Sequence, residues 1–364
     1  MFALAFFVGL LLPLALFTQI YLVVLAIFGL MLLRHHKQLP ERSLLFWAAI
    51  ISLFWGAAVG AVQASTVRHG LGVFLGWVVV PAGVIVLLTA APKKAKQWLQ
   101  NGLLAGLLLT VFLVFLQAIN HPIVWRWQSL ADLSQYFNTG RLTGPFVSPN
   151  TLALYAVPLV FLLLGQARPK SQQYLLVATA ALLLLASQSV GGILAALLGV
   201  LFAIALTRLP KHRPYIFVLL TLMGAATFSI NWSVRREIWQ GAYALLKHHW
   251  LFGLGIGNFQ TAYTDLVKDN THLTQYVAPY ALHPHSLILA TVAEAGLFAL
   301  VGLTLLFGYA FWMQLKHSKP NPWYLAALLS ILIHGFVDTP FWQATLAPLT
   351  FIVLAYAIME PDES

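Results

Sequence analysis

The chain has 364 residues, of which 60% are hydrophobic and only 8% are charged, whereas a soluble globular chain carries about 25% charged residues. With a mean hydropathy of +0.83, this composition excludes a soluble domain and predicts an all-α integral membrane protein, one polytopic domain over residues 1–364. The absence of cysteine excludes disulfides, thiolate metal sites and cysteine nucleophiles.

Apolar runs of roughly 17 to 25 residues suffice to cross a bilayer as helices. Residues 2–33 carry no charge and contain Pro13 and the pair Thr18-Gln19, which predicts a tight hairpin of two short helices. Further runs follow at 44–63, 71–90, 99–118, 150–166, 173–188, 192–207, 214–231, 286–312, 323–337 and 344–358. The sequence therefore predicts about twelve transmembrane helices.

The basic residues predict the orientation. One set of alternate connections holds 13 of the 20 lysines and arginines, and the other set holds 7. The positive-inside rule places the richer set in the cytoplasm, so both termini are expected there and the long polar segment 232–285 is expected as a large periplasmic loop. The net charge of +10 is then explained by topology and by contacts with membrane lipids, and no nucleic-acid partner is expected.

The first polar motif runs from Arg141 to Asn150, where a long loop enters an apolar run. Glycine and proline fix a turn here, and Ser148 or Asn150 can cap the helix that follows. A helix N-terminus beside an arginine can bind an anion, and a plain capped loop is the alternative.

The second motif is the pair Arg235-Arg236 at the head of the polar segment. Adjacent arginines just outside the membrane can bind a phosphate group bidentately. Contact with lipid headgroups is the alternative, above all for Arg235. We expect Arg236 to contact the phosphate.

The third motif is His283-Pro284-His285-Ser286. Histidine is the side chain best suited to move a proton near neutral pH, although a surface histidine is often only polar filler. His285 directly precedes the apolar run from Leu287, so a rigid helix start can fix its height. His283 precedes a proline, which favours extended backbone, and is expected to shape the loop.

Glu294 is a charge two turns inside the same predicted helix, which costs about 3 kcal/mol unless it is paired or faces water. It follows His285 by nine residues, which places the two on opposite faces of a regular helix. We expect Glu294 to orient a neighbouring helix in the first place and to act in catalysis only in the second.

The fourth motif runs from His334 to Pro340 and contains Asp338. His334 and Asp338 are four residues apart, so on one helix they share a face and can hydrogen-bond. Asp338 can equally steady an arginine or hold a substrate hydroxyl. No His-Glu-x-x-His or comparable ligand spacing occurs, so no metal is expected.

In this order the motifs resemble those of the O-antigen ligase and O-antigen polymerase superfamily of bacterial membrane glycosyltransferases. The matching segments are Arg141-x-x-Gly144-x-Phe146-x-x-Pro149-Asn150, Arg236-x-x-Trp239, Leu251 to Phe259, His285-Ser286 with Gly296, and His334 to Pro340. Two positions depart from the pattern. The family's Ser-Arg-Gly becomes Ser189-Val190-Gly191 within residues 187–192, so Arg141 or Arg235 would have to replace the missing arginine. Ala299 stands where the ligase motif prefers glycine, threonine or tyrosine, which weakens a ligase against a polymerase.

The resemblance implies a GT-C-like fold in the bacterial inner membrane and an inverting transfer at the periplasmic face, without metal or cofactor. The donor would be a glycan on undecaprenyl pyrophosphate, and the acceptor a glycan or glycolipid, either lipid A core or a growing chain. His285 would be the general base, and Arg236, Arg141 and Arg235 would bind the pyrophosphate. His283, Glu294, His334 and Asp338 would support them. Ligase and polymerase stay open, and a transporter or lipid-linked oligosaccharide flippase is the alternative class.

Overall fold

The structure is a computed structural model that describes residues 1–15, 20–35, 42–120, 140–209, 215, 218–219, 222, 233–269, 281–317 and 319–359. Within these residues every regular element is a helix and no strand occurs. The predicted helix at 214–231 lies almost entirely outside the described residues, as do residues 121–139 and 270–280 of the two predicted long loops.

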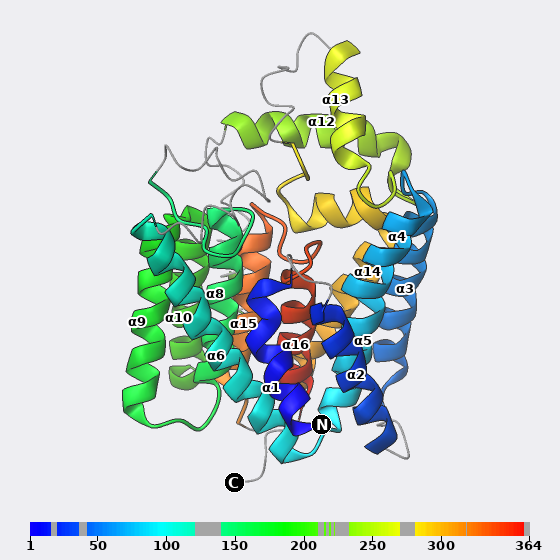
Figure 1. Cartoon of the computed structure of the whole chain (residues 1–364). Coiled ribbons are helices and arrows are strands. Elements are labelled where there is room, and N and C mark those ends of the chain that lie inside the picture. Colours follow the sequence, from blue (N-terminus) through cyan, green and yellow to red (C-terminus); the bar gives the residue numbers. More distant parts are fainter. Residues whose placement is uncertain are drawn as a thin grey trace.

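The helices form a bundle with two further helices at one end (Figure 1). The bundle helices are α1 (Phe2–Leu11), η1 (Leu12–Leu14), α2 (Ile20–His35), α3 (Leu44–Val62), α4 (Val67–Val73), η2 (Phe74–Val79), α5 (Val80–Thr89), α6 (Lys93–Ala118), α8 (Pro149–Leu164), α9 (Lys170–Ser187), α10 (Val190–Arg208), α14 (Leu287–Lys316), α15 (Pro322–Gly335) and α16 (Leu346–Ile358). The other two are α12 (Ser233–His249), which lies across the bundle, and α13 (Phe259–Asp269), which stands upright (Figure 1). We call the end that carries α12 and α13 the upper end; α1 begins and α16 finishes at the lower end (Figure 1).

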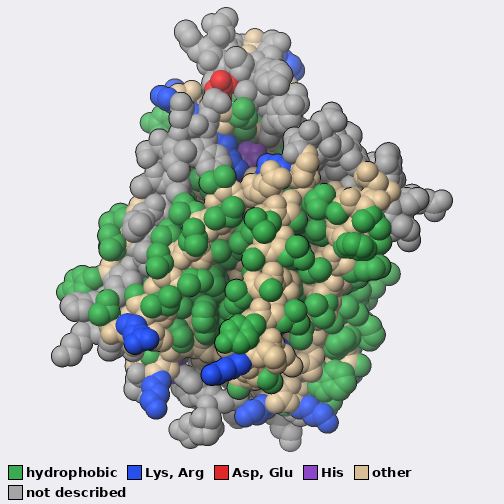
Figure 2. Space-filling model, turned by 90° about the vertical axis from the view of Figure 1, so that its left-hand side faces the viewer, with side chains coloured by type: hydrophobic (Ala, Val, Ile, Leu, Met, Phe, Trp, Pro, Cys, Tyr) green, Lys and Arg blue, Asp and Glu red, His purple; other side chains and the backbone are tan. Residues whose placement is uncertain are grey.

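Length and composition make this an α-helical membrane protein. Among the described residues five helical stretches are long and apolar enough to cross a membrane, namely Leu44–Val62, Val67–Thr89, Lys93–Ala118, Val190–Arg208 and Leu287–Lys316. Five apolar helices are shorter: Phe2–Leu14, Ile20–Arg34, Pro149–Leu164, Pro322–Gly335 and Leu346–Ile358. Figure 2 shows hydrophobic side chains over the middle of one face, with lysine and arginine gathered at its lower rim. Twelve membrane helices stay a prediction.

Helices α3 and α14 pack with their backbones in close contact because small residues face each other. A Cβ atom on Gly56 or Gly60 of α3 would collide with the backbone of α14, and one on Gly302 of α14 would collide with α3. Ala299 is fully buried at this contact, opposite Gly56. Lipid tails remove the hydrophobic driving force between helices, and small residues let the two backbones approach closely enough for van der Waals packing to hold them together.

The predicted continuous helix at 286–312 is broken at Gly296, where the backbone has φ 72° and ψ −174°. Glycine tolerates this left-handed conformation because it has no Cβ atom. The first part of α14 lies across the upper end of the bundle, and the second part descends through it (Figure 1). At the break, the backbone N–H of Leu297 donates to the carbonyl groups of Trp250 and Leu251, 3.0 and 3.1 Å away.

The glycine-rich loop between α12 and α13 closes this junction. The N–H of Leu254 donates to the Ala293 carbonyl at 2.8 Å, and the N–H of Ile256 donates to the Gly60 carbonyl at 2.9 Å. The N–H of Gly257 donates to the Glu294 carboxylate at 2.6 Å. Glu294 therefore contacts a loop, whereas we expected it to orient a neighbouring helix.

Candidate active site

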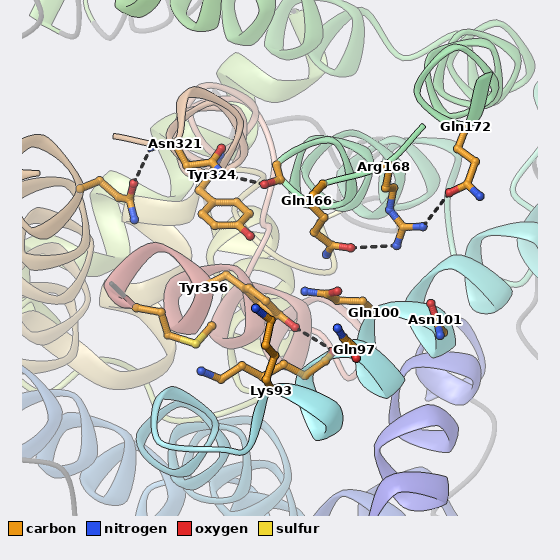
Figure 3. Close-up of a pocket in the computed structure, with 15 residues that line it drawn as sticks. Lys93, Gln97, Gln100, Asn101, Gln166, Arg168, Gln172, Asn321, Tyr324 and Tyr356 are labelled. Atoms are coloured by element: carbon orange, nitrogen blue, oxygen red, sulfur yellow. Dashed lines mark hydrogen bonds between the residues drawn. The ribbon is translucent and has the colours of Figure 1, made fainter. Parts of the chain in front are cut away.

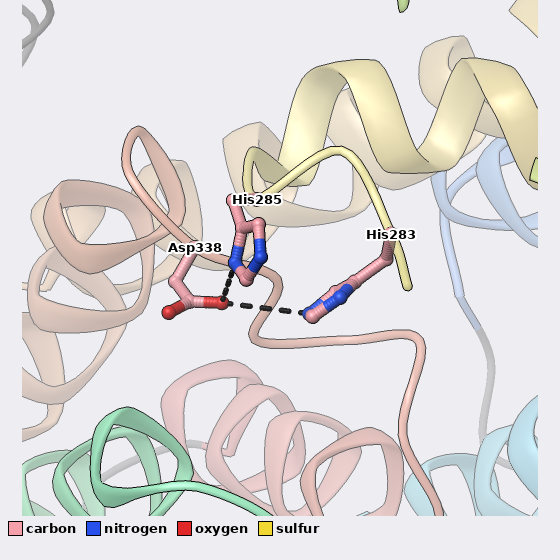
Figure 4. A group of neighbouring side chains, drawn as sticks. All are labelled: His283, His285 and Asp338. Carbon is pink, nitrogen blue, oxygen red and sulfur yellow. Dashed lines mark hydrogen bonds and ion pairs between the residues drawn. The ribbon is translucent and has the colours of Figure 1, made fainter. Parts of the chain in front are cut away.

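Three side chains from two distant segments meet at the upper end of the bundle (Figure 4). The Nδ1 atom of His285 lies 3.4 Å from Oδ1 of Asp338, and Nε2 of His283 lies 3.6 Å from the same oxygen. The two imidazole rings are 4.4 Å apart between centroids. We call these three residues the histidine cluster.

His285 is held in place by its backbone. Its φ of 47° is in the left-handed region, which a residue with a side chain adopts only when its surroundings impose it. The next residue, Ser286, is the N-cap of α14, and its carbonyl accepts a hydrogen bond from the N–H of Ala290 at 2.8 Å. The indole N–H of Trp239 donates to the His285 carbonyl at 3.4 Å. His285 thus lies directly before the N-cap of α14, and its role as a base stays a prediction.

Asp338 lies in a tight turn after α15, not on the helix. The predicted helix at 323–337 ends at Gly335, so His334 and Asp338 do not share a helical face as expected. Instead the N–H of Asp338 donates to the His334 carbonyl at 3.0 Å, and the N–H of Thr339 donates to the Asp338 carboxylate at 2.9 Å. The His334 ring packs against Gly191 at the start of α10.

Of the two adjacent arginines, Arg235 faces the histidine cluster and Arg236 is exposed. The Nη2 atom of Arg235 donates to Oδ2 of Asp338 at 3.4 Å, with side-chain exposures of 13% and 4%. Burial alone would raise the pKa of Asp338. The hydrogen bond from His285 and the charge of Arg235 outweigh burial and hold that pKa well below its ordinary value. The carboxylate therefore stays ionised.

Arg141 anchors the first motif to the turn between α9 and α10. Its Nε atom donates to the Ser187 carbonyl at 2.9 Å, and its Nη2 atom donates to the Asn150 side-chain oxygen at 3.0 Å. Ser148 caps α8, accepting from the N–H of Thr151 at 3.1 Å. Burial first, and the charge of Arg141 as well, lower the pKa of Arg235. The two guanidinium groups therefore belong to one electropositive region, and Arg141 is bonded to the turn that lacks the family's arginine.

Comparison with known proteins agrees with the motifs. Residues 175–304, from α9 into α14, match the family described as O-antigen ligase. This match supports membership of the O-antigen ligase and polymerase family. The matched segment contains Arg235, Arg236, His283, His285 and Glu294, whereas Arg141 and Asp338 lie outside it. No curated protein matches the chain.

For a ligase or polymerase of this family, the histidine cluster offers a proton acceptor. When Nδ1 of His285 carries the proton and faces the Asp338 carboxylate, Nε2 is the ring nitrogen with a lone pair. A carboxylate in this position fixes both the tautomer and the ring orientation. Burial first, and then the neighbouring His285, lower the pKa of His283 to about 3, against the opposing effect of Asp338. His283 is therefore neutral at pH 7 and a weak base.

The same cluster has the donor atoms of a metal site, because one atom each from His283, His285 and Asp338 lies within 4.8 Å of the others. Divalent metals favour such imidazole and carboxylate ligands. The Arg235 guanidinium, however, already occupies the second Asp338 oxygen, and its positive charge opposes a cation at this point. The electrostatics therefore favour an anionic substrate over a metal ion.

The sequence missed the link between His285 and Asp338, which are 53 residues apart. It also missed the contact of Trp239 with the His285 backbone. One alternative was close to what the structure has, since Asp338 was expected to be able to steady an arginine, and that arginine is Arg235. Periodicity reports contacts only within a helix, so no sequence signal singled out these longer-range partners.

Proposed function

We propose that this member of the O-antigen ligase and polymerase family transfers a glycan from undecaprenyl pyrophosphate to a hydroxyl group of an acceptor sugar at its upper end. The arrangement of His285, Asp338 and Arg235 carries this proposal, because it combines an oriented base with a buried positive charge. With 13 of the 20 basic residues in the opposite set of connections, the upper end faces the periplasm of a bacterial inner membrane.

In the proposed reaction His285 is the general base. Its Nε2 atom takes the proton of the acceptor hydroxyl while the oxygen attacks the anomeric carbon of the donor sugar. The new bond joins that oxygen to the anomeric carbon, and the bond from the anomeric carbon to the pyrophosphate oxygen breaks. A single displacement inverts the configuration and leaves undecaprenyl pyrophosphate. Asp338 stabilises the imidazolium that forms.

Arg235 and Arg141 are proposed to hold the pyrophosphate as it leaves. Each has a guanidinium at the same electropositive region, where low exposure strengthens the attraction for a developing negative charge. Arg236 is exposed on the next position of α12 and is proposed as an outer contact of the same group. His283 packs on the His285 ring and positions it.

The alanine at position 299, which weakens a ligase against a polymerase in the family pattern, also has an explanation in helix packing. Ala299 is fully buried against Gly56 of α3, so the close contact of the two helices accounts for its small side chain. The acceptor must therefore be identified by experiment. Purified protein is given the lipid-linked glycan with either lipid A core or a second lipid-linked glycan, and the product is resolved by size.

The deciding test of the mechanism compares His285→Ala with the wild-type protein and with His248→Ala, a change at an exposed histidine of α12. Loss of a general base costs about 10²- to 10⁴-fold in rate, so His285→Ala should lose transfer while still binding the lipid-linked donor. His248→Ala should keep wild-type turnover. Wild-type transfer by His285→Ala would remove this residue from the mechanism.

Orientation is tested with single cysteines at two exposed positions. Asp265→Cys in α13 should react with an impermeant thiol reagent added to the periplasmic side, and Lys94→Cys at the start of α6 should not. The chain has no native cysteine to interfere. Labelling of Lys94→Cys from the periplasmic side would reverse the proposed orientation.

A further inference from the structure

Aromatic side chains are exposed where the turn after α12 meets the break in α14. In the turn, Trp250 is 52% exposed and Phe252 is 44% exposed, and Phe298 of α14 is 39% exposed. The Phe252 and Phe298 rings lie side by side, with their centroids 6.3 Å apart. We call these three side chains the aromatic edge. Aromatic rings bury a large apolar area when they are covered, so a group of exposed rings marks a contact surface.

The backbone holds the aromatic edge against α14. The N–H of Leu297 donates to the carbonyl groups of Trp250 and Leu251 at 3.0 and 3.1 Å. A Cβ atom on Gly253, whose φ is 78°, would collide with the backbone of the first part of α14. The turn is therefore fixed to the helix, and its exposed rings keep their level relative to the bundle.

That level follows from the exposed face of α14 below the aromatic edge. Val301 lies three residues after Phe298 on the same face and is 41% exposed, and Trp312 near the lower end is 50% exposed. The Lys316 ammonium lies 5.2 Å from the Trp312 ring centroid, an aromatic and basic pair typical of a membrane interface. Phe298 and Trp312 are 14 residues apart, about 21 Å along the helix, whereas the hydrocarbon core is about 30 Å thick. With Trp312 at the lower interface, Phe298 lies inside the core, and Phe252 beside it lies near the upper boundary.

Lys247 adds a positive charge just above the aromatic edge. It is exposed in the last turn of α12, three residues before Trp250, and residues 238–264 contain no acidic residue. Within the part of the chain that the structure describes, Lys247 has no ion pair. At the lower end, by contrast, the Arg168 guanidinium is hydrogen-bonded to the side chains of Gln166 and Gln172 (Figure 3). Lys247 can stabilise the end of the α12 dipole, a role that needs no lipid, or it can contact an anionic headgroup.

We propose that the aromatic edge and Lys247 hold the end of α12 in the headgroup layer of the membrane at the upper end. Trp250 and Phe252 lie at the boundary of the acyl chains, and Lys247 contacts the phosphate of an anionic phospholipid. Near the start of the same helix, Arg235 is paired with Asp338. Helix α12 is thus held by the histidine cluster at one end and by lipid at the other, which fixes the height of its arginines.

The membrane contact is tested on the full chain, which has no cysteine of its own. Phe252→Cys is labelled with an environment-sensitive fluorophore and reconstituted in phosphatidylcholine vesicles. Its emission should be lost when the lipid carries a nitroxide near the top of the acyl chain, whereas a label on Asp265→Cys, at a 63% exposed position of α13, should keep its emission. Unchanged emission of the Phe252→Cys label would overturn the proposal, whether water or another protein covers the edge. Trp250→Cys carries the label if Phe252→Cys does not fold.

A second comparison decides the charge of the lipid. With the nitroxide on phosphatidylglycerol instead of phosphatidylcholine, at the same mole fraction, quenching of the Phe252→Cys label should increase, because one lysine near the surface favours an anionic lipid about fivefold. Adding Lys247→Gln should remove this preference, and adding Lys268→Gln, on the exposed surface of α13, should not. Equal quenching by the two lipids, or a preference that survives Lys247→Gln, would overturn the headgroup contact of Lys247.

Discussion

Asp338→Asn tests the two tasks proposed for Asp338, namely orienting His285 and pairing with Arg235. The amide keeps the shape of the carboxylate and removes its charge. His285 then faces a group that no longer fixes its tautomer or stabilises the imidazolium, so transfer should fall by about 10²- to 10⁴-fold. Arg235, 13% exposed, is left beside a neutral partner. Breaking a buried ion pair on one side costs about 3–5 kcal/mol of unfolding free energy.

Both quantities can be measured on the same purified protein. Turnover is followed with saturating lipid-linked donor, and stability by thermal unfolding in detergent. Asp265→Asn is the matched control, because Asp265 pairs with Lys268 at 2.9 Å on the surface, where both side chains are 63% exposed. Such a pair is worth at most about 1 kcal/mol, and its loss should leave turnover unchanged.

The double variant Arg235→Gln with Asp338→Asn completes the cycle. It removes both charges, so it should be more stable than the sum of the two single losses predicts, while transfer stays low. Wild-type turnover in Asp338→Asn would refute the orientation of His285 by this carboxylate. Additive stability losses would refute the ion pair.

Three further changes probe the surroundings. Arg141→Lys keeps the charge but loses the planar fork that joins Ser187 to Asn150, so turnover should fall at least tenfold at unchanged expression, and wild-type turnover would exclude Arg141 from donor binding. Folding lowers the pKa of His283 from 6.5 to about 3, so the unfolded chain binds more protons between these values. Stability is therefore full above pH 6.5 and falls toward pH 3 by up to about 1.4 kcal/mol per pH unit, and His283→Gln should flatten this acid limb of the melting temperature. Gly296→Ala forces a side chain into a left-handed backbone against Leu251 and should cost more than about 1 kcal/mol, whereas Gly308→Ala, with open space in the same helix, should be neutral or stabilising; equal melting temperatures would refute the constraint at Gly296.

Hydropathy predicted the helices of the bundle well because burial in lipid needs only long apolar runs. The predicted run 44–63 is the helix Leu44–Val62, and the predicted run 192–207 is Val190–Arg208. The break at Gly296 could not be predicted in the same way. At the break, the N–H of Leu297 donates to the carbonyl groups of Trp250 and Leu251, which belong to a separate segment of the chain. A glycine inside an apolar run permits such a break but does not require it.

The sequence pointed to the residues of the candidate site but not to the contacts between them. Ionisable residues are rare in this chain and are energetically costly near a membrane, so they usually have a function. For this reason the sequence singled out His285, Asp338, Arg235 and Arg141. Their pairing depends on how α12, α14 and α15 meet at the upper end. The sequence favoured Arg236 over Arg235 for the phosphate contact. Which of two adjacent residues faces the bundle depends on how the helix packs, and in the structure it is Arg235 that faces Asp338.

The glycine-rich loop between α12 and α13 is held against α14 by hydrogen bonds. Gly257 bonds to Glu294, and Leu254 bonds to Ala293, so the loop is tied to the last turn of the first part of α14. That part of the helix begins at Leu287, directly after His285 and its cap Ser286, and ends at Gly296. A short rigid helix fixed at its far end transmits its position to its start, because its backbone hydrogen bonds resist bending. The hydrogen bond from Gly257 to Glu294 therefore holds the far end of the short helix whose other end begins directly after His285 and Ser286.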